Sequence, residues 1–314
     1  MLRLGSALRA NRATLVAQYA GQEGFLDATR AVRSIAAVAT LDDLLDLRDA
    51  EFRRCLGYIR GAAHCSDVAG SEIRLLCPLT RPTRIRDCGM ITTHLRPAFA
   101  QMIGRLRQMD DVDTGPAVQA LESRLLGAGK RTLSWGERDP ATLSASCDPI
   151  ANPGGELDFE LEMAVAVRRR DNGDPEIFGY TLYNDWTLRD VQVQTFARTL
   201  NLHGPAKNFR GSNSFGPMIV MADDVADPMN QILRIEVDGQ LFAEGTLAAA
   251  DWTIPEAVAE LYSREPISGT ELLGSGTVLG GSMFERGLVL RPGSSVVLSN
   301  PSIGALENRA GEAA

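Results

Sequence analysis

The stretch Gly155-Glu-Leu-Asp-Phe-Glu-Leu-Glu-Met-Ala-Val-Ala-Val167 decides how the rest of the chain is interpreted. Large apolar residues alternate there with acidic or small ones, and this period of two predicts a β-strand. In such a strand Glu160 and Glu162 lie on the same face, about 7 Å apart. Two carboxylates this close repel each other unless a positive charge lies between them, and Mg²⁺, Ca²⁺ and Mn²⁺ prefer oxygen ligands. The stretch therefore indicates either a site for a hard divalent cation or the polar face of an exposed strand.

The bulk composition is that of a globular protein large enough for one sizeable core or two domains, with 314 residues, 44% hydrophobic and 23% charged. A net charge of −8 disfavours nucleic-acid binding, which needs a basic face. The sequence contains no apolar run long enough to span a membrane and no secretory signal. Its five cysteines form no paired motif, as expected of reduced thiols. We therefore expect a cytoplasmic protein with no nucleic-acid or membrane partner.

Periodicity and turn residues predict a small N-terminal α+β domain over residues 1–78 and a larger domain over residues 79–314. A helix is expected from an N-cap at Thr40 to Ile59. Further helices are expected from Thr92 or Thr93, and over 117–126, 187–198 and 254–264, the third with a capping box of Thr187 and Asp190. A hairpin over 232–242 turns at Asp238-Gly239, and the tail after Asn308 should be frayed. The overall expectation is an α+β fold that is predominantly β.

Several polar residues outside the central strand could serve a site, although each has an ordinary structural explanation. Asp87 and His94 lie seven residues apart across a predicted strand-to-helix junction, and Asp185 ends a predicted strand. Lys207 lies in a predicted loop of small and polar residues, where a cation can reach an anionic ligand. Helix capping, a core histidine and a solvated lysine are the alternative interpretations.

Taken in order, these segments resemble the fumarylacetoacetate hydrolase family, and their spacing is similar to its fumarylacetoacetase branch. The similarity covers about residues 75 to 308 and rests on Asp87 with His94, Glu160-Leu-Glu162, Asn184-Asp185-Trp186-Thr-Leu-Arg189-Asp-Val-Gln192, Lys207, Gly274-Ser-Gly-Thr277 and Gly281-Ser-Met-Phe-Glu285. The resemblance implies a fumarylacetoacetase-type mixed β-sandwich roll and a homodimer.

The resemblance also implies roles for individual residues. One divalent cation, with Mg²⁺ preferred and Ca²⁺ or Mn²⁺ as alternatives, is expected to be held by Asp87, Glu160, Glu162 and Asp185. The expected catalytic residues are His94, Glu285 and Lys207, and the expected substrate-binding residues are Arg189, Gln192 and Thr277, with Trp135 in place of a pocket tyrosine. Cys88 and Gly89 follow Asp87 where the family has an aromatic residue, so the identity of the substrate stays open.

The residue types match the hydrolysis of a carbon–carbon bond in a diketo acid or acylpyruvate-like small molecule. A histidine such as His94 can take a proton from water near neutral pH, and a carboxylate such as Glu285 can hold the ring in the required tautomer. Lys207 and Gln192 can donate hydrogen bonds to the oxyanion that develops. Two alternatives remain, namely a decarboxylase, tautomerase or isomerase of 2-oxo acids on the same metal site, and a non-catalytic binding or scaffold protein.

Overall fold

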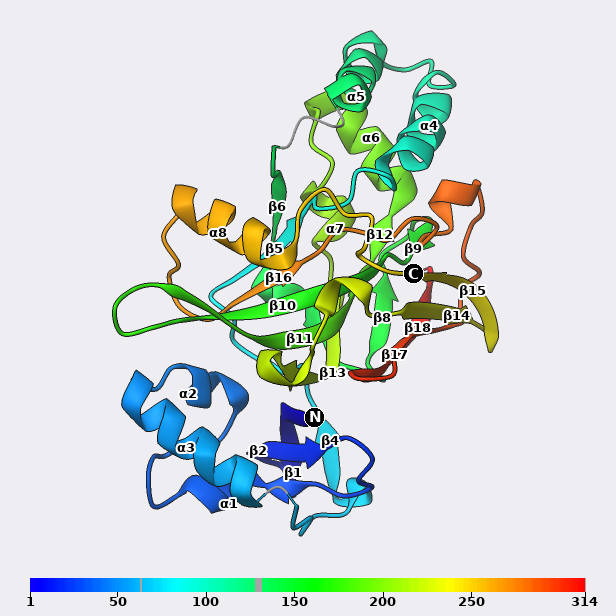
Figure 1. Cartoon of the computed structure of the whole chain (residues 1–314). Coiled ribbons are helices and arrows are strands. Elements are labelled where there is room, and N and C mark those ends of the chain that lie inside the picture. The colour runs from blue at the N-terminus through cyan, green and yellow to red at the C-terminus, as the bar shows by residue number, and fades with distance from the viewer. Residues whose placement is uncertain (63, 128–131, 314) are drawn as a thin grey trace.

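The computed structural model describes residues 1–62, 64–127 and 132–313, and two β-sheets form the body of this part of the chain (Figure 1). Eleven of its strands make the larger sheet. Nine follow the order β3 (Leu26–Asp27), β2 (Arg12–Tyr19), β1 (Leu2–Arg9), β13 (Asn213–Met221), β11 (Pro175–Asp185), β10 (Leu161–Arg169), β16 (Glu271–Gly274), β5 (Arg84–Cys88), β6 (Trp135–Arg138), while β4 (Ile73–Leu75) pairs with β1 and β7 (Leu143–Ser144) with β13.

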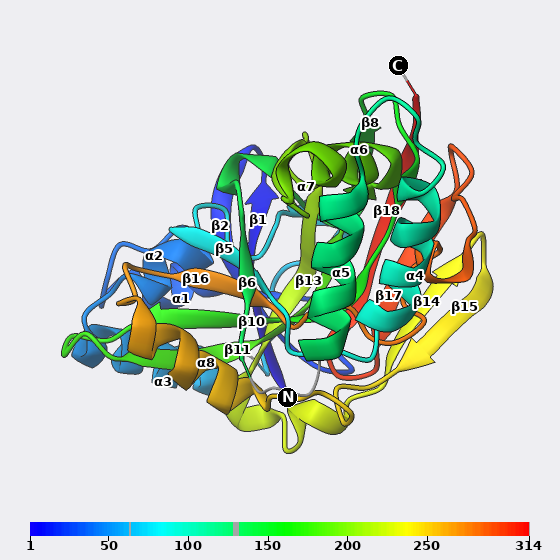
Figure 2. The ribbon, with the colours of Figure 1, turned by 90° about the horizontal axis from the view of Figure 1, so that it is seen from above.

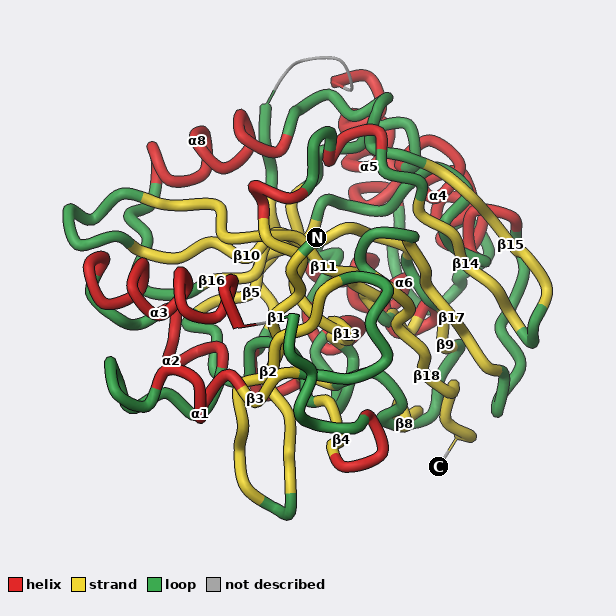
Figure 3. The backbone as a smooth tube through the Cα atoms, turned by 60° about the horizontal axis from the view of Figure 1, so that its bottom comes forward, coloured by secondary structure: helices red, strands yellow, loops and turns green. Residues whose placement is uncertain are grey.

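A smaller sheet lies on the side of the molecule away from α8, the helix Ile254–Arg264 (Figure 3). Its strands follow the order β15 (Gln240–Gly245), β14 (Leu233–Val237), β17 (Ser295–Asn300), β18 (Gly304–Ala313), β8 (Pro149–Asn152). Apolar side chains of both sheets share one core, which includes Met163, Val165, Ile235 and Leu298. A further pair of short strands is formed by β9 (Leu157–Asp158) and β12 (Thr187–Leu188). The expected α+β fold with a predominance of β-structure is confirmed.

Helices cover both ends of the sheets. The N-terminal part carries α1 (Ala28–Val32), α2 (Leu41–Leu45) and α3 (Asp49–Ala62), and the opposite end carries α4 (Leu95–Leu106), α5 (Gly115–Gly127), α6 (Arg189–Thr199) and α7 (Gly204–Lys207). Short 3₁₀ helices are η1 (Gly70–Glu72), η2 (Pro140–Thr142), η3 (Ala222–Asp224), η4 (Pro228–Asn230) and η5 (Phe284–Arg286). Figure 2 shows α4, α5 and α6 together, packed through a separate apolar cluster. In the described residues, no helix has the length and apolarity needed to cross a membrane.

The strand over residues 161–169, which carries Glu162, is buried on both faces. Its large apolar residues point into the core between the two sheets, while Ala164 and Ala166 pack on the other side with residues of the N-terminal part. Glu160 is 4% exposed and Glu162 0%. The interpretation as an exposed polar face is therefore wrong. The predicted single strand is also divided, because β9 leaves the main sheet to pair with β12 and β10 begins only at Leu161.

Three local predictions agree with the structure. Thr40 caps α2 through a capping box with Asp43, whose carboxylate accepts a hydrogen bond from the backbone N–H of Thr40. The 232–242 hairpin turns at Asp238 and Gly239, which have positive φ values of 50° and 76°. The last predicted helix is α8, with the expected bounds.

Other local predictions are wrong, and in each case a segment distant in sequence contacts the residues concerned. Thr187 does not cap a helix, since it belongs to β12, and Asp190 instead accepts a hydrogen bond from the backbone of Glu156. The helix expected over residues 40–59 breaks between α2 and α3, where the buried Arg168 donates to the carbonyl oxygens of Leu45 and Leu47. The tail after Asn308 is not frayed, because it forms the end of β18 between β17 and β8.

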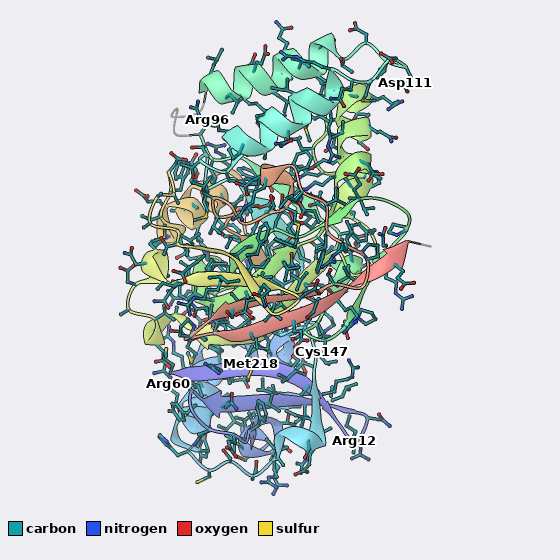
Figure 4. All side chains as sticks on the ribbon, turned by 90° about the vertical axis from the view of Figure 1, so that its right-hand side faces the viewer. Arg12, Arg60, Arg96, Asp111, Cys147 and Met218 are labelled. Atoms are coloured by element: carbon teal, nitrogen blue, oxygen red, sulfur yellow. The ribbon has the colours of Figure 1, made fainter. Side chains whose placement is uncertain are left out.

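The N-terminal part joins the larger sheet through its first strand. β1 runs antiparallel to β13, with Arg3 opposite Val220 and Leu4 opposite Ile219. Figure 4 shows Met218 at this junction, and its side chain belongs to an apolar cluster with Ala7 and Val16. The main sheet therefore continues across the predicted boundary near residue 78.

Candidate functional site

Three carboxylates from three strands meet at one end of the larger sheet. Asp87 lies on β5, Glu162 on β10 and Asp185 at the end of β11, and each offers an oxygen within 4.8 Å of the others. Between them lies Gly274 of β16, which pairs with Asp87. A Cβ atom at Gly274 would lie 2.6 Å from Glu162 Oε2. The space between the carboxylates therefore depends on glycine at this position.

These three residues fit a divalent cation. In the part of the chain that the structure describes, Asp87 Oδ1 is buried and has no hydrogen-bond partner, so it keeps an unused electron pair. Carboxylate oxygens are the ligands that Mg²⁺, Mn²⁺ and Ca²⁺ prefer. Three of the four predicted metal ligands thus lie together.

The fourth predicted ligand, Glu160, is instead engaged by side-chain cations. Its Oε1 accepts a hydrogen bond from Arg189 Nη2 at 2.8 Å, and its Oε2 accepts one from Lys207 Nζ at 2.5 Å. Burial alone would raise the pKa of Glu160, but Lys207 and Arg189 outweigh burial and hold that pKa well below its ordinary value. Glu160 is therefore a fixed anion that positions Lys207, which lies in α7 rather than in the expected loop.

The pKa of Glu162 is shifted in the opposite direction to that of Glu160. Among the described residues, its carboxylate accepts hydrogen bonds only from neutral groups, the backbone N–H of Gly276 at 3.0 Å and the hydroxyl of Thr277 at 3.3 Å. Burial, reinforced by Asp87 and Asp185, raises the pKa of Glu162 well above its ordinary value. Burial alone would also raise the pKa of Asp185, but the positive charges of Arg138 and Lys207 outweigh burial and lower that pKa.

Arg138 belongs to this group although sequence reasoning missed it. Its Nη2 donates to Asp87 Oδ2 at 2.8 Å and to Asp185 Oδ2 at 2.7 Å, and its Nε donates to Asp185 Oδ1 at 3.2 Å. Lys207 Nζ also donates to Asp185 Oδ2. Arg138 lies in a four-residue strand, within a stretch whose composition predicts loop and short strands. So short a strand has too few residues to show a periodic pattern that would identify Arg138.

The charges of the cluster do not cancel. Five acidic side chains, Asp87, Asp158, Glu160, Glu162 and Asp185, face three cations, Arg138, Arg189 and Lys207, in a chain of contacts that is largely shielded from solvent. Two negative charges therefore remain when all eight groups are ionised. One divalent cation would balance them, and burial makes such a balance important because uncompensated buried charge is costly.

His94 and Glu285 form a separate pair beside this cluster. His94 precedes the first residue of α4, and its Nδ1 lies 2.9 Å from Glu285 Oε1, although the angle at Nδ1 is not that of a hydrogen bond. The carboxylate of Glu285 is held in place by the backbone N–H of Gly280 at 2.8 Å and the hydroxyl of Ser282 at 3.2 Å. The pair that was predicted from residues 191 positions apart is thus in contact.

A cavity of about 100 Å³ lies beside both groups. Its polar wall includes Asp87, His94, Glu160, Arg189, Gln192, His203, Lys207 and Thr277, and its apolar wall includes Leu95, Ala98, Phe99 and Met102 of α4 together with Phe284. Arg189 and Gln192 contact each other at 3.1 Å, and the Gln192 amide donates to Leu202 O at 2.9 Å. The cavity can therefore hold a small molecule with a polar end and an apolar end.

Trp135, expected to replace a pocket tyrosine, does not line this cavity. Side chains alternate along a strand, so Gly136 and Arg138 of β6 face the site while Trp135 and Glu137 face away from it. The Trp135 ring lies instead 5.7 Å from the guanidinium of Arg264 in α8. The pleat of β6 sets this orientation of Trp135, and no strand over residues 135–138 is evident from the sequence.

Comparisons with known proteins agree with this architecture. Residues 132–310 match the C-terminal region of fumarylacetoacetate (FAA) hydrolase. The chain is 26% identical over 184 residues to oxaloacetate tautomerase YisK of Bacillus subtilis (strain 168), a match that covers 55% of this chain and 60% of that protein. It is 30% identical over 159 residues to a 4-hydroxyphenylacetate degradation bifunctional isomerase/decarboxylase of Salmonella dublin, over 49% of this chain and 35% of that protein. The chain therefore spans less than two thirds of either relative.

Solved structures show the same fold. Fumarylacetoacetate hydrolase from Exiguobacterium antarcticum superposes with a TM-score of 0.69 at 20% identity, over 99% of both chains. Maleylpyruvate hydrolase from Sphingobium sp. SYK-6, in complex with manganese(II) and pyruvate, superposes with a TM-score of 0.68 at 18% identity, over 99% of this chain and 100% of that chain. Since the matched region 132–310 is more than half of the sequence, the chain belongs to the fumarylacetoacetate hydrolase family.

Proposed function

We propose that the protein is a divalent-cation-dependent enzyme that hydrolyses a carbon–carbon bond in a diketo acid or acylpyruvate-like substrate. The observation that carries this proposal is that His94, in contact with Glu285, lines the same cavity of about 100 Å³ as Asp87 and Lys207. A histidine that could act as the base for water and one carboxylate of the acidic cluster, Asp87, therefore face one small-molecule space. Hydrolysis of a carbon–carbon bond needs both a base and a cation, because water must attack a carbonyl and the leaving enolate must be stabilised.

The proposed cation is Mg²⁺, with Mn²⁺ and Ca²⁺ as alternatives, because a cluster of carboxylates accepts several hard ions. Asp87, Glu162 and Asp185 would hold it. When bound, such an ion polarises the neighbouring oxo and enolate oxygens of an oxo acid. Support for a metal also comes from the maleylpyruvate hydrolase structure, which contains manganese(II) and pyruvate.

The protein's own residues would do the remaining work. His94 would take a proton from water, with Glu285 fixing the orientation of its ring and stabilising the imidazolium. Lys207, held by Glu160 and Asp185, would donate a hydrogen bond to the oxyanion that forms on the substrate. Gln192 and Thr277 line the cavity and would contact the substrate's oxygen atoms, while α4 would contact its apolar end.

A second candidate is a tautomerase, isomerase or decarboxylase of 2-oxo acids. The observation that favours it is the position of Lys207 next to the acidic cluster, since enolisation needs these groups but no activated water. The curated relatives include an oxaloacetate tautomerase and an isomerase/decarboxylase.

The change His94→Ala separates the two candidates. We expect hydrolysis of acetylpyruvate to fall by about 10²–10⁴-fold, because a positioned general base is lost. Tautomerisation of oxaloacetate should persist, because it does not use the water base. Both reactions are followed by ultraviolet absorbance with Mg²⁺ or Mn²⁺ present.

His64→Ala is the matched control, since His64 is exposed and stacks on Tyr19 in the N-terminal part. Unchanged hydrolysis in the His94 variant would rule out the proposed water base. If the unmodified protein turns over neither compound and no cation raises its melting temperature, a binding or scaffold role is favoured instead.

We also propose that the protein is a homodimer. Four large apolar side chains, Leu241, Leu279, Leu288 and Val289, are 49–61% exposed on β15 and the segment before β17. Arg286 lies 4.1 Å from the ring of Phe242, which links these two segments. Exposed apolar groups of this kind suit a second copy of the chain, and light scattering in solution measures the mass directly.

A further inference from the structure

His203, which precedes the first residue of α7, is fitted closely against β6. A Cβ atom at Gly136 would lie 2.5 Å from both Cε1 and Nε2 of the His203 ring and 2.7 Å from Cδ2. Three nearly equal distances mean that the ring lies with its face over Gly136. The absence of a side chain at Gly136 therefore leaves the space that the His203 ring occupies.

Arg138 determines which ring nitrogen carries the proton. Its Nη1 lies 3.0 Å from His203 Nδ1, and a guanidinium can only donate, so Nδ1 accepts. Burial, together with the positive charges of Arg138 and Lys207, lowers the pKa of His203 to about 3. The ring is therefore neutral at physiological pH, and its single N–H is at Nε2.

This N–H group has no hydrogen-bond partner among the residues that the structure describes. In residues 1–62, 64–127 and 132–313, Nε2 of His203 makes no hydrogen bond, and it is not among the polar atoms that are sealed from solvent. His203 lines the cavity next to Lys207. In contrast, the Arg189 nitrogens donate to Asp158, Glu160 and Gln192, and Lys207 donates to Glu160 and Asp185.

We propose that His203 is a substrate-binding residue that helps to set specificity, by donating its Nε2–H to an oxygen atom of the oxo acid in the cavity. This inference rests on the proposed function, because it assumes an oxo acid as the ligand. A neutral donor recognises a carbonyl or carboxylate oxygen without adding charge to the site. Gly136 and Arg138 act as positioning residues, since one makes room for the ring and the other fixes its tautomer.

Three variants test this role. His203→Leu removes the donor, His203→Gln keeps an N–H group near the same place, and Gly136→Ala pushes the ring aside. The substrate is whichever of acetylpyruvate and oxaloacetate the unmodified protein turns over. We expect His203→Leu and Gly136→Ala to raise KM and the Kd for pyruvate by about tenfold, with kcat largely kept, because one neutral hydrogen bond is lost. His203→Gln should restore most of the affinity.

The controls separate this inference from the proposed function. His64→Leu should leave KM unchanged, and all variants should keep the rise in melting temperature that Mn²⁺ gives the unmodified protein. If His203→Leu and Gly136→Ala bind pyruvate and turn over substrate with an unchanged KM, His203 does not contact the substrate although the enzyme functions as proposed. If the unmodified protein binds neither Mn²⁺ nor pyruvate, the proposed function fails, and this inference fails with it.

Discussion

Glu162 is the carboxylate of the buried cluster that has the least support from positive charge. Glu160 and Asp185 are each in contact with two cations, whereas in the described part of the chain Glu162 is hydrogen-bonded only by Gly276 and Thr277. The raised pKa of Glu162 means that the metal-free protein folds more readily with this group protonated. At the scale of the single residue, the cation that we propose would therefore compete with a proton for the Glu162 carboxylate.

The change Glu162→Gln should remove part of the pH dependence of stability. An acid with a raised pKa in the folded state contributes stability that is fully present below its ordinary value of 4.5 and is lost as pH rises through the folded-state pKa. With a chelator present, we expect the melting temperature of the unmodified protein to fall by several degrees between pH 5 and pH 8, and that of the variant to fall less. Differential scanning fluorimetry measures both.

Adding Mn²⁺ gives the complementary result. It should raise the melting temperature of the unmodified protein at pH 8 but raise that of the Glu162→Gln variant much less, because the variant replaces a charged carboxylate of the proposed site with a neutral amide. Glu51→Gln on the exposed face of α3 is the control and should behave like the unmodified protein. Equal stabilisation of all three proteins by Mn²⁺ would show that Glu162 does not hold the cation.

Sequence reasoning predicted the proximity of residues that stand in recognisable spacings and missed contacts between residues that do not. Asp87, Glu162 and Asp185 meet as expected because regular strands carry them to one end of the sheet. Arg138 and His203 are 65 residues apart, and their contact depends on how β6 and α7 come together. No local pattern encodes such a contact, so it could be found only in three dimensions.

At the scale of the element, the break between α2 and α3 shows how a distant side chain overrides a local preference. Residues 40–59 have the periodicity of one helix, but Arg168 inserts from β10, 123 residues away from Leu45. The same guanidinium pairs with Asp49 and Glu176 and lies 4.1 Å from the ring of Phe52. Helical periodicity could predict both helices but not the point at which they separate.

Replacing this arginine should loosen the N-terminal helices from the main sheet. Arg168→Ala removes a buried cation that holds two carbonyl oxygens and two carboxylates, so we expect a loss of about 2–3 kcal/mol in the free energy of unfolding. Both acids keep contact with solvent, which limits the loss. Arg170→Ala should cost less than about 1 kcal/mol, since Arg170 is 36% exposed and lies 3.4 Å from Asp49. Urea denaturation measures the two values, and equal losses would contradict this account.

At the scale of the whole molecule, we propose that residues 1–78 and 79–314 fold together as one cooperative unit, although the sequence marks a boundary near residue 78. Turn residues and composition mark that boundary locally, and they predicted a separate N-terminal domain. The pairing of β1 with β13, and an apolar cluster that contains Leu4, Phe178 and Ile219, connect the two sides. Pairing between strands so distant in sequence leaves no local signal.

Removal of residues 1–78 should therefore yield a chain that aggregates. Without β1 the backbone of β13 loses a hydrogen-bonded neighbour, and Phe178 and Ile219 lose apolar contacts. We expect the full chain to unfold in a single calorimetric transition and the shortened chain to elute from size-exclusion chromatography as large aggregates. A monodisperse, folded 79–314 chain, or two separate transitions in the full chain, would show that the two parts fold independently.

The same strand pairing has a consequence for biosynthesis. The ribosome makes β1 long before β13, and Arg3 of β1 pairs with Val220 of β13, so the residues between these strands must be translated before they can pair. During that interval the nascent N-terminal segment has an unpaired strand edge and a bare apolar surface. Such a segment suits protection by a chaperone, and slow translation of residues 80–220 would lengthen its exposure.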